Sequence, residues 1–238
     1  MFDRNAPRKP FVARGSRIER CADCFVSSDL CLCDAKPNMS AQATFWLMTH
    51  HNEVYKPTNT GRLVLDAIAD SQLLTWSRTE PDPHFLALLQ NTAYQPCIVF
   101  PAGEGYEDRM VSAQQLAASG KKPALILLDG TWRQARRMFR LSRYLDELPA
   151  IEPLPGRESR YDLRQAAASH HLSTAEVAAA VLEDLGDRDS AAALNAYFDL
   201  FNAAYYASRR QLDLSEKMAA ARTKLAELSA QRMLQEEK

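Results

Sequence analysis

Short apolar runs recur along the chain, and polar turns or amphipathic stretches separate them. The run at 125–128 is unbroken and too short for a free-standing helix, which is typical of a strand buried on both faces of a parallel sheet. Together the runs predict strands at residues 43–49, 73–76, 96–100, 125–128 and 149–154. The stretches between and after the runs predict helices that include residues 63–68, 83–90, 131–140, 173–176 and 190–210. Strands that alternate with helices indicate an α/β fold, a mostly parallel sheet with flanking helices.

Polar residues follow the strand at 125–128 in an order that suits a functional site. Asp129 comes directly after the strand, and Gly130 allows backbone conformations that other residues avoid. Thr131 can cap the start of the next helix. Ligands of open α/β sheets bind beyond the carboxyl ends of the strands. The sequence therefore predicts Asp129 as a candidate active-site carboxylate.

The helix after Asp129 carries four arginines on one side. At about 100° per residue they fall within an arc of about 100°, and we call them the arginine face: Arg133, Arg136, Arg137 and Arg140. Ala135, Met138 and Phe139 point away from this arc and can pack on the sheet. A face of this kind is often only a solvated surface. Its place one turn from a carboxylate favours phosphate binding instead, for which the fork-shaped guanidinium is suited.

Four of the five cysteines lie close together near the start of the chain. They form the pairs Cys21–Cys24 and Cys31–Cys33, whereas Cys97 lies in an apolar run and is predicted to be a buried core thiol. In a cytosolic protein such clustering favours a metal over disulfides, and four thiolates suit a structural Zn²⁺ site. Redox-active or simply reduced thiols are the alternative.

Composition and charge restrict the expected binding partners and the expected location of the protein. The chain has 238 residues, 46% of them hydrophobic, and a formal net charge of −1, which by itself says nothing about nucleic acid. Positive charge is concentrated in residues 1–20, a basic arm that is either a binding segment for a polyanion or a plain disordered tail. No apolar run reaches membrane-spanning length and residues 1–20 lack a signal-peptide apolar stretch, so the expectation is a cytoplasmic protein without a membrane partner.

The polar loop after the first strand carries a further candidate site. Lys56, Asn59 and Arg62 lie around a predicted helix start, where phosphate, ribose or amino-acid groups can be bound. A metal site at His50, His51 and Glu53 is disfavoured, because adjacent residues at a strand end point in opposite directions. A purely structural role for the loop is the alternative. Ser173 and Glu176 form the Ser-x-x-Glu pattern of a helix cap, and we assign both a structural role.

The stretch Asp129-Gly130-Thr131-Trp132, followed by Arg133-Gln134-Ala135-Arg136, resembles the signature of the DTW-domain proteins. The resemblance implies a tRNA-uridine aminocarboxypropyltransferase, which moves the 3-amino-3-carboxypropyl group of S-adenosylmethionine onto N3 of a uridine, in bacterial relatives one in the variable loop. It also implies a SPOUT-like fold with a C-terminal trefoil knot, and a cysteine-rich start that fits Zn²⁺. The resemblance covers most of residues 21–210 and fades at both ends. The predicted organisation is a basic arm (1–20), a four-cysteine module (21–40), a catalytic domain (41–210) and a C-terminal helix (211–238).

The resemblance also implies which residues meet each substrate. The walls of the S-adenosylmethionine pocket would come from loops after neighbouring strands: Phe100, Pro101, Gly103, Asp129, Gly130, Thr131, Leu154, Pro155 and Thr174. The tRNA contacts would include Lys56, Asn59, Arg62, Trp132, the arginine face, Arg160, Tyr161 and Arg164.

The catalytic role of Asp129 and the reaction itself have alternatives. Asp129 would act either as the base that removes the uracil N3 proton, which requires burial to raise its pKa, or as an orienting group for the cofactor or the Thr131 loop. Two other functions stay open: a SPOUT-type methyltransferase that uses the same cofactor, and a zinc-bearing RNA-binding protein without catalysis.

Overall fold

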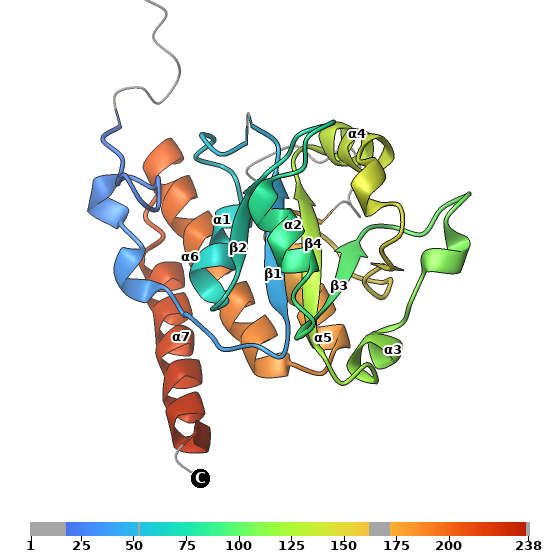
Figure 1. The fold of residues 1–238 in the computed structure, drawn as a ribbon. Helices are drawn as coiled ribbons and strands as arrows, with labels where there is room; N and C mark the ends of the chain where they lie inside the picture. Colours follow the sequence, from blue (N-terminus) through green and yellow to red (C-terminus); the bar gives the residue numbers. More distant parts are fainter. Residues whose placement is uncertain (1–17, 52, 162–171, 237–238) are drawn as a thin grey trace, which may run out of the picture.

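A computed structural model describes residues 18–51, 53–161 and 172–236 of the chain. Within these residues, five parallel strands form one sheet in the order β2-β1-β4-β3-β5 (Figure 1). The strands are β1 (Thr44–Thr49), β2 (Gln72–Thr75), β3 (Tyr94–Val99), β4 (Lys122–Asp129) and β5 (Ala150–Ile151). The predicted α/β class and parallel sheet are confirmed.

Helices cover both faces of the sheet, as predicted. On one face α1 (Gly61–Ala67), α5 (Thr174–Asp184) and α6 (Arg188–Arg210) enclose the larger apolar core, which includes Leu63, Val181 and Phe198. On the other face α2 (Pro83–Leu89) and α4 (Trp132–Leu141) enclose a second core with Phe85 and Met138. Because both faces are covered, β1 is buried throughout and β4 is buried from Pro123 to Asp129, as their apolar runs predicted.

Two elements differ from the prediction. The strand expected at 149–154 has only two residues, β5, because prolines at 149, 153 and 155 remove the backbone donors that a longer ladder needs. The short helix α3 (Ala113–Ala117) was not predicted, although Ser112 and Gln115 form a capping box at its start. Short 3-10 helices occupy Ser28–Leu30, Cys33–Ala35, Glu107–Arg109 and Arg143–Leu145.

The C-terminal helix is more than a solvated appendage. The helix α7 (Ser215–Glu236) runs along α6, and Figure 1 shows the two side by side next to the blue segment that holds the first described residues. Ala221 and Leu225 are buried in the larger core, and Arg222 donates to Asp34 Oδ2 at 2.8 Å and to the carbonyl oxygen of Cys31 at 3.1 Å. The helix therefore packs against both α6 and the four-cysteine module. Among the helices in these residue ranges, none is both long and apolar enough to cross a bilayer.

The strand order creates a crevice between the carboxyl ends of β1 and β4. After β1 the chain passes to α1 on one face of the sheet, and after β4 it passes to α4 on the opposite face. Adjacent strands whose connections leave toward opposite faces open a binding crevice in α/β proteins. Thr49 and Asp129 are register partners at the end of these two strands, so both border the crevice.

Candidate active site and four-cysteine centre

Asp129 is buried at the crevice, and three side chains donate hydrogen bonds to its carboxylate. Asn59 Nδ2 donates to Oδ2 at 2.7 Å and the Thr49 hydroxyl to the same oxygen at 3.3 Å. The Thr174 hydroxyl donates to Oδ1 at 2.8 Å. These donors come from the end of β1, the loop before α1 and the start of α5. Asp129 therefore joins three segments that are distant in sequence.

Burial raises the pKa of Asp129 above its ordinary value, and the charge of the buried Glu53 adds to this effect. The hydrogen bonds from Asn59, Thr174 and Thr49 act in the opposite direction, because they favour the ionised form. The net direction is upward. This is the change that a carboxylate needs to accept a proton near neutral pH.

Gly61, the first residue of α1, lies directly against Asp129. A Cβ atom at this position would lie 2.8 Å from the carboxylate carbon and both of its oxygens. Any larger residue here would displace the carboxylate. The position therefore requires glycine because of close approach and not because of backbone conformation.

A cavity of about 620 Å³ opens over Asp129. Its walls come from the loops after β4, β3 and β5, the loop before α1 and the start of α5. Of the residues predicted for the cofactor pocket, the cavity is lined by Phe100, Pro101, Asp129, Gly130, Thr131, Leu154, Pro155 and Thr174. Its size lies within the usual range for a small-molecule pocket, about 300 to 1,000 Å³.

Gly103, the remaining predicted cofactor residue, does not line this cavity. A Cβ at Gly103 would lie 2.6 Å from the hydroxyl oxygen of Tyr106, and this hydroxyl donates to the carbonyl oxygen of Pro101 at 2.6 Å. Gly103 thus makes room for a hydrogen bond that holds the turn after β3. The contact of Gly103 with the cofactor stays a prediction.

The site also contains residues that sequence reasoning missed or placed elsewhere. Thr49 was read only as part of a strand, and its contact with Asp129 follows from the pairing of β1 with β4. Asn59 was predicted as a tRNA contact, whereas it lines the cavity and donates to Asp129. Glu152 also lines the cavity and had not been singled out.

Helix α4 begins as predicted and presents the arginine face to solvent. Thr131 and Gln134 form a capping box, and Met138 packs into the smaller core. All four residues of the arginine face are exposed, and Trp132, Arg133 and Ala135 of α4 line the cavity. The positively charged surface therefore begins at the rim of the pocket.

Several predicted tRNA contacts are engaged within the protein. Lys56 pairs with the buried Glu53, and the Tyr161 hydroxyl donates to the carbonyl oxygen of Thr58. Arg160 forms two hydrogen bonds to Asp199, at 2.8 and 2.9 Å. Arg164 and most of the basic arm lie outside the described residues.

Arg62 is turned into the protein, between the four-cysteine module and α6. Its guanidinium carbon lies 4.6 Å from the ring centre of Phe25 and 5.8 Å from that of Phe201, and it donates to the carbonyl oxygen of Pro57. Burial lowers the pKa of its guanidinium. Its backbone N–H also donates to Asn59 Oδ1 at 3.3 Å. Arg62 therefore connects the cysteine turn to the loop that holds Asp129.

The side chains of His50 and His51 do not point in opposite directions, as alternation along a strand would predict. His50 follows the last residue of β1, and its ring stacks on that of His51 with centroids 4.4 Å apart. The premise that the two rings point apart is therefore wrong. Among the described residues, the group that could hold a metal is the cysteine cluster.

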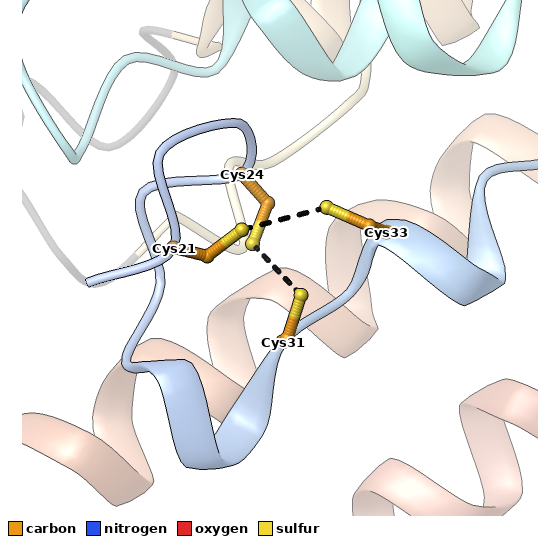
Figure 2. Close-up of side chains that lie close together, drawn as sticks. All are labelled: Cys21, Cys24, Cys31 and Cys33. Carbon is orange, nitrogen blue, oxygen red and sulfur yellow. Dashed lines mark hydrogen bonds between the residues drawn. The ribbon is translucent and has the colours of Figure 1, made fainter. Parts of the chain in front are cut away.

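Cys21, Cys24, Cys31 and Cys33 converge on one point, and Figure 2 shows their sulfurs facing one another. All four sulfurs lie within 4.8 Å of one another; Cys21 and Cys33 are 3.6 Å apart, and Cys24 and Cys31 3.8 Å. A Zn²⁺ bound by four thiolates at about 2.3 Å requires sulfur separations of about 3.8 Å. A disulfide requires about 2.0 Å, and all five cysteines are free. The four cysteines can therefore bind a metal ion such as zinc.

The thiols differ in their environments. Backbone N–H groups of Cys24 and Asp23 lower the pKa of Cys21 to about 6, whereas burial raises the pKa of Cys24. Cys97 is fully buried, as predicted, and burial raises its pKa to about 12.

Comparison with known proteins gives one family. The model of the DTW domain matches residues 18–206, which include the cysteine cluster, Asp129 and the cavity walls. No solved structure matches the chain. Since the match covers most of the sequence, the chain belongs to the DTW domain family.

Proposed function

We propose that the protein transfers the 3-amino-3-carboxypropyl group of S-adenosylmethionine to N3 of a uridine in tRNA and releases methylthioadenosine. Membership of the DTW domain family is consistent with a tRNA-modifying transferase. The observation that carries the proposal is the buried Asp129, which lies in a cavity whose rim begins the arginine face.

The cavity suits a cofactor with both apolar and polar parts. Phe100, Leu128 and Val177 supply apolar wall, and Thr58, Glu152 and Ser159 supply polar groups. In this proposal the adenosine part packs on the apolar wall, and the amino and carboxylate groups bind the polar residues. Bound S-adenosylmethionine supplies an electrophilic carbon next to a positively charged sulfur.

Asp129 is the proposed proton acceptor. The uracil N3–H must lose its proton before N3 can attack the carbon next to sulfur. Asp129 takes that proton, the new N3–C bond forms, and the C–S bond breaks with its electron pair going to sulfur. Asn59 and Thr174 keep the carboxylate oriented through the step.

The arginine face is proposed to bind the tRNA backbone. Its four guanidinium groups lie on the solvent side of α4 and begin at the pocket rim, so they can hold phosphates on either side of the target nucleotide. Binding of this kind weakens as salt rises, because condensed counterions are released.

A SPOUT-like knot and a bound zinc ion are further parts of the proposal. The cavity walls come from the loops after β4, β3 and β5, which are neighbours in the sheet, and this supports a SPOUT-like cofactor site. Residues 162–171, which lie between β5 and α5 in the sequence, are outside the described residues. The cysteine geometry supports zinc.

The test is mass spectrometry of nucleosides and by-products after incubation of the protein with tRNA and S-adenosylmethionine. The expected products are a uridine that carries the aminocarboxypropyl group and an equal amount of methylthioadenosine. A methylated nucleoside with S-adenosylhomocysteine would refute the proposal in favour of methyl transfer. An unmodified tRNA that the protein still binds would indicate a binding protein without catalysis.

A further inference from the structure

Three aromatic rings stack beside Asp129, outside the cavity. The ring of His50 lies 4.4 Å from that of His51 and 5.6 Å from that of Trp76, with interplanar angles of 28° and 20°. His50 is 9% exposed and Trp76 is half-buried, whereas His51 is exposed. The stack therefore has a buried part and an exposed end at His51.

The buried part of the stack is anchored to the active site and to α4. The backbone N–H of His50 donates to the carbonyl oxygen of Asp129 at 3.0 Å. The amide Nε2 of Gln134 lies 3.3 Å from Nδ1 of His50, and the indole N–H of Trp76 donates to Ser142 Oγ at 2.8 Å. Because these bonds hold the inner rings, little ordering is required when another ring packs on the outer one.

Charges around the stack connect it to the arginine face. Burial lowers the pKa of His50, and the nearby positive groups of His51, Lys56 and Arg137 act in the same direction. The buried Glu53 acts in the opposite direction. Gln134, whose amide lies 3.3 Å from His50 Nδ1, is one turn before Arg137 on α4, so the stack lies beside the arginine face. An anion held by that face would lie close to the exposed ring.

We propose that the exposed ring of His51 is a stacking platform for one unpaired nucleobase of the RNA, adjacent to the nucleotide that enters the cavity. This inference rests on the proposed tRNA substrate and adds a site to it. A flat, exposed ring on a fixed stack, next to guanidinium groups, combines the two features by which proteins hold single-stranded nucleic acid: a stacking surface and a cationic track.

The platform also has a use in the reaction. The uracil N3 edge is paired or stacked in folded RNA, so the target must leave its stack to reach Asp129. A neighbouring base that stacks on His51 would hold the strand open while the target occupies the cavity. Loss of a base-stacking ring typically weakens binding about 5- to 150-fold.

The experiment measures binding of an unmodified tRNA transcript at several salt concentrations for the wild-type protein, H51L and H51F. Leucine removes the aromatic face while keeping apolar bulk, whereas phenylalanine restores the face without the imidazole nitrogens. A matched control is H84L, because His84 is also an exposed histidine but lies on α2. Thermal unfolding of each variant verifies the fold.

We expect H51L to bind about 5- to 150-fold more weakly, with H51F and H84L close to wild type. The slope of affinity against salt should not change in H51L, because no phosphate contact is lost. Transcripts with single abasic nucleotides locate the base: one position should weaken binding to the wild-type protein but not to H51L.

Three results overturn the platform. Equal binding by H51L and wild type removes it and leaves the transferase proposal intact. Equal weakening of H51L and H51F means that the imidazole nitrogens act, not stacking. A wild-type protein that binds no tRNA at low salt refutes both this inference and the proposed tRNA substrate, whereas modification that proceeds normally in H51L refutes the platform's use in the reaction alone.

Discussion

Replacing Asp129 by asparagine separates the chemistry of the carboxylate from its structural contacts. The amide has nearly the same shape, and its oxygen can accept the hydrogen bonds from Asn59 and Thr49 that now reach Oδ2. Its NH₂ group then faces the Thr174 hydroxyl, which can turn and accept. We therefore expect Asp129→Asn to fold with its three contacts retained.

The raised pKa of Asp129 determines how the stability of Asp129→Asn compares with that of the wild-type protein. Since the pKa of Asp129 is raised in the folded protein, the ionised form is less favourable there than in the unfolded chain. Wild-type stability should therefore rise as pH falls through the raised pKa toward the ordinary value of about 3.9, by about 1.4 kcal/mol for each pH unit that separates the two pKa values. Asp129→Asn removes that dependence and should be at least as stable as wild type at pH 7. Asp129→Ala leaves the Asn59 amide unpaired and should lose about 1–3 kcal/mol.

The activity of the variant should fall sharply if Asp129 accepts the N3 proton. Loss of a general base typically reduces kcat by about 10²- to 10⁴-fold, or roughly 3–5 kcal/mol in the activation free energy. Wild-type kcat should fall as pH is lowered through the raised pKa, and Asp129→Asn should lack this limb. The measurement is single-turnover formation of the modified nucleoside from pH 5 to 9.

Three outcomes would contradict this reasoning. A kcat within about threefold of wild type would exclude Asp129 as the base. A normal kcat together with a raised KM for S-adenosylmethionine would assign it the orienting role instead. An unfolded Asp129→Asn protein would contradict the structural account of its three partners.

Three further predictions concern the surroundings of this carboxylate. Gly61→Ala places a Cβ 2.8 Å from the Asp129 carboxylate, so it should lower the free energy of unfolding by about 1–3 kcal/mol and weaken S-adenosylmethionine binding in calorimetry; unchanged binding would contradict the close approach. Cys24→Ser should abolish the binding of about one Zn²⁺ per chain and lower the melting temperature, measured by elemental analysis and calorimetry; full zinc content would contradict the four-thiolate site. Arg136→Ala should reduce the slope of log affinity for tRNA against log salt by about 0.9 while Lys224→Ala on α7 should not, and equal slopes would count against the arginine face.

Local features of the fold could be predicted because they depend on residues close together in the chain. The apolar run at 125–128 identified β4, and Thr131 with Gln134 determined where α4 begins. The four-cysteine centre could be predicted for the same reason, since its cysteines lie within thirteen residues. The resemblance of residues 129–136 to the DTW signature indicated the family, which the match over residues 18–206 confirms.

The tertiary structure decided which side chains meet. The run at 125–128 determined that Asp129 follows a buried strand, but the pairing of β4 with β1 is what brings Thr49 to its carboxylate. In the same way Arg62 and Arg160 are arginines beside polar loops in the sequence, and only the packing of α6 turns them toward Phe201 and Asp199. The physical reason is that an apolar strand can bury its side chains equally well next to several different strands, so its own sequence does not select its partner. The order of the sheet, and with it every long-range contact of the site, is set by the packing of the whole chain.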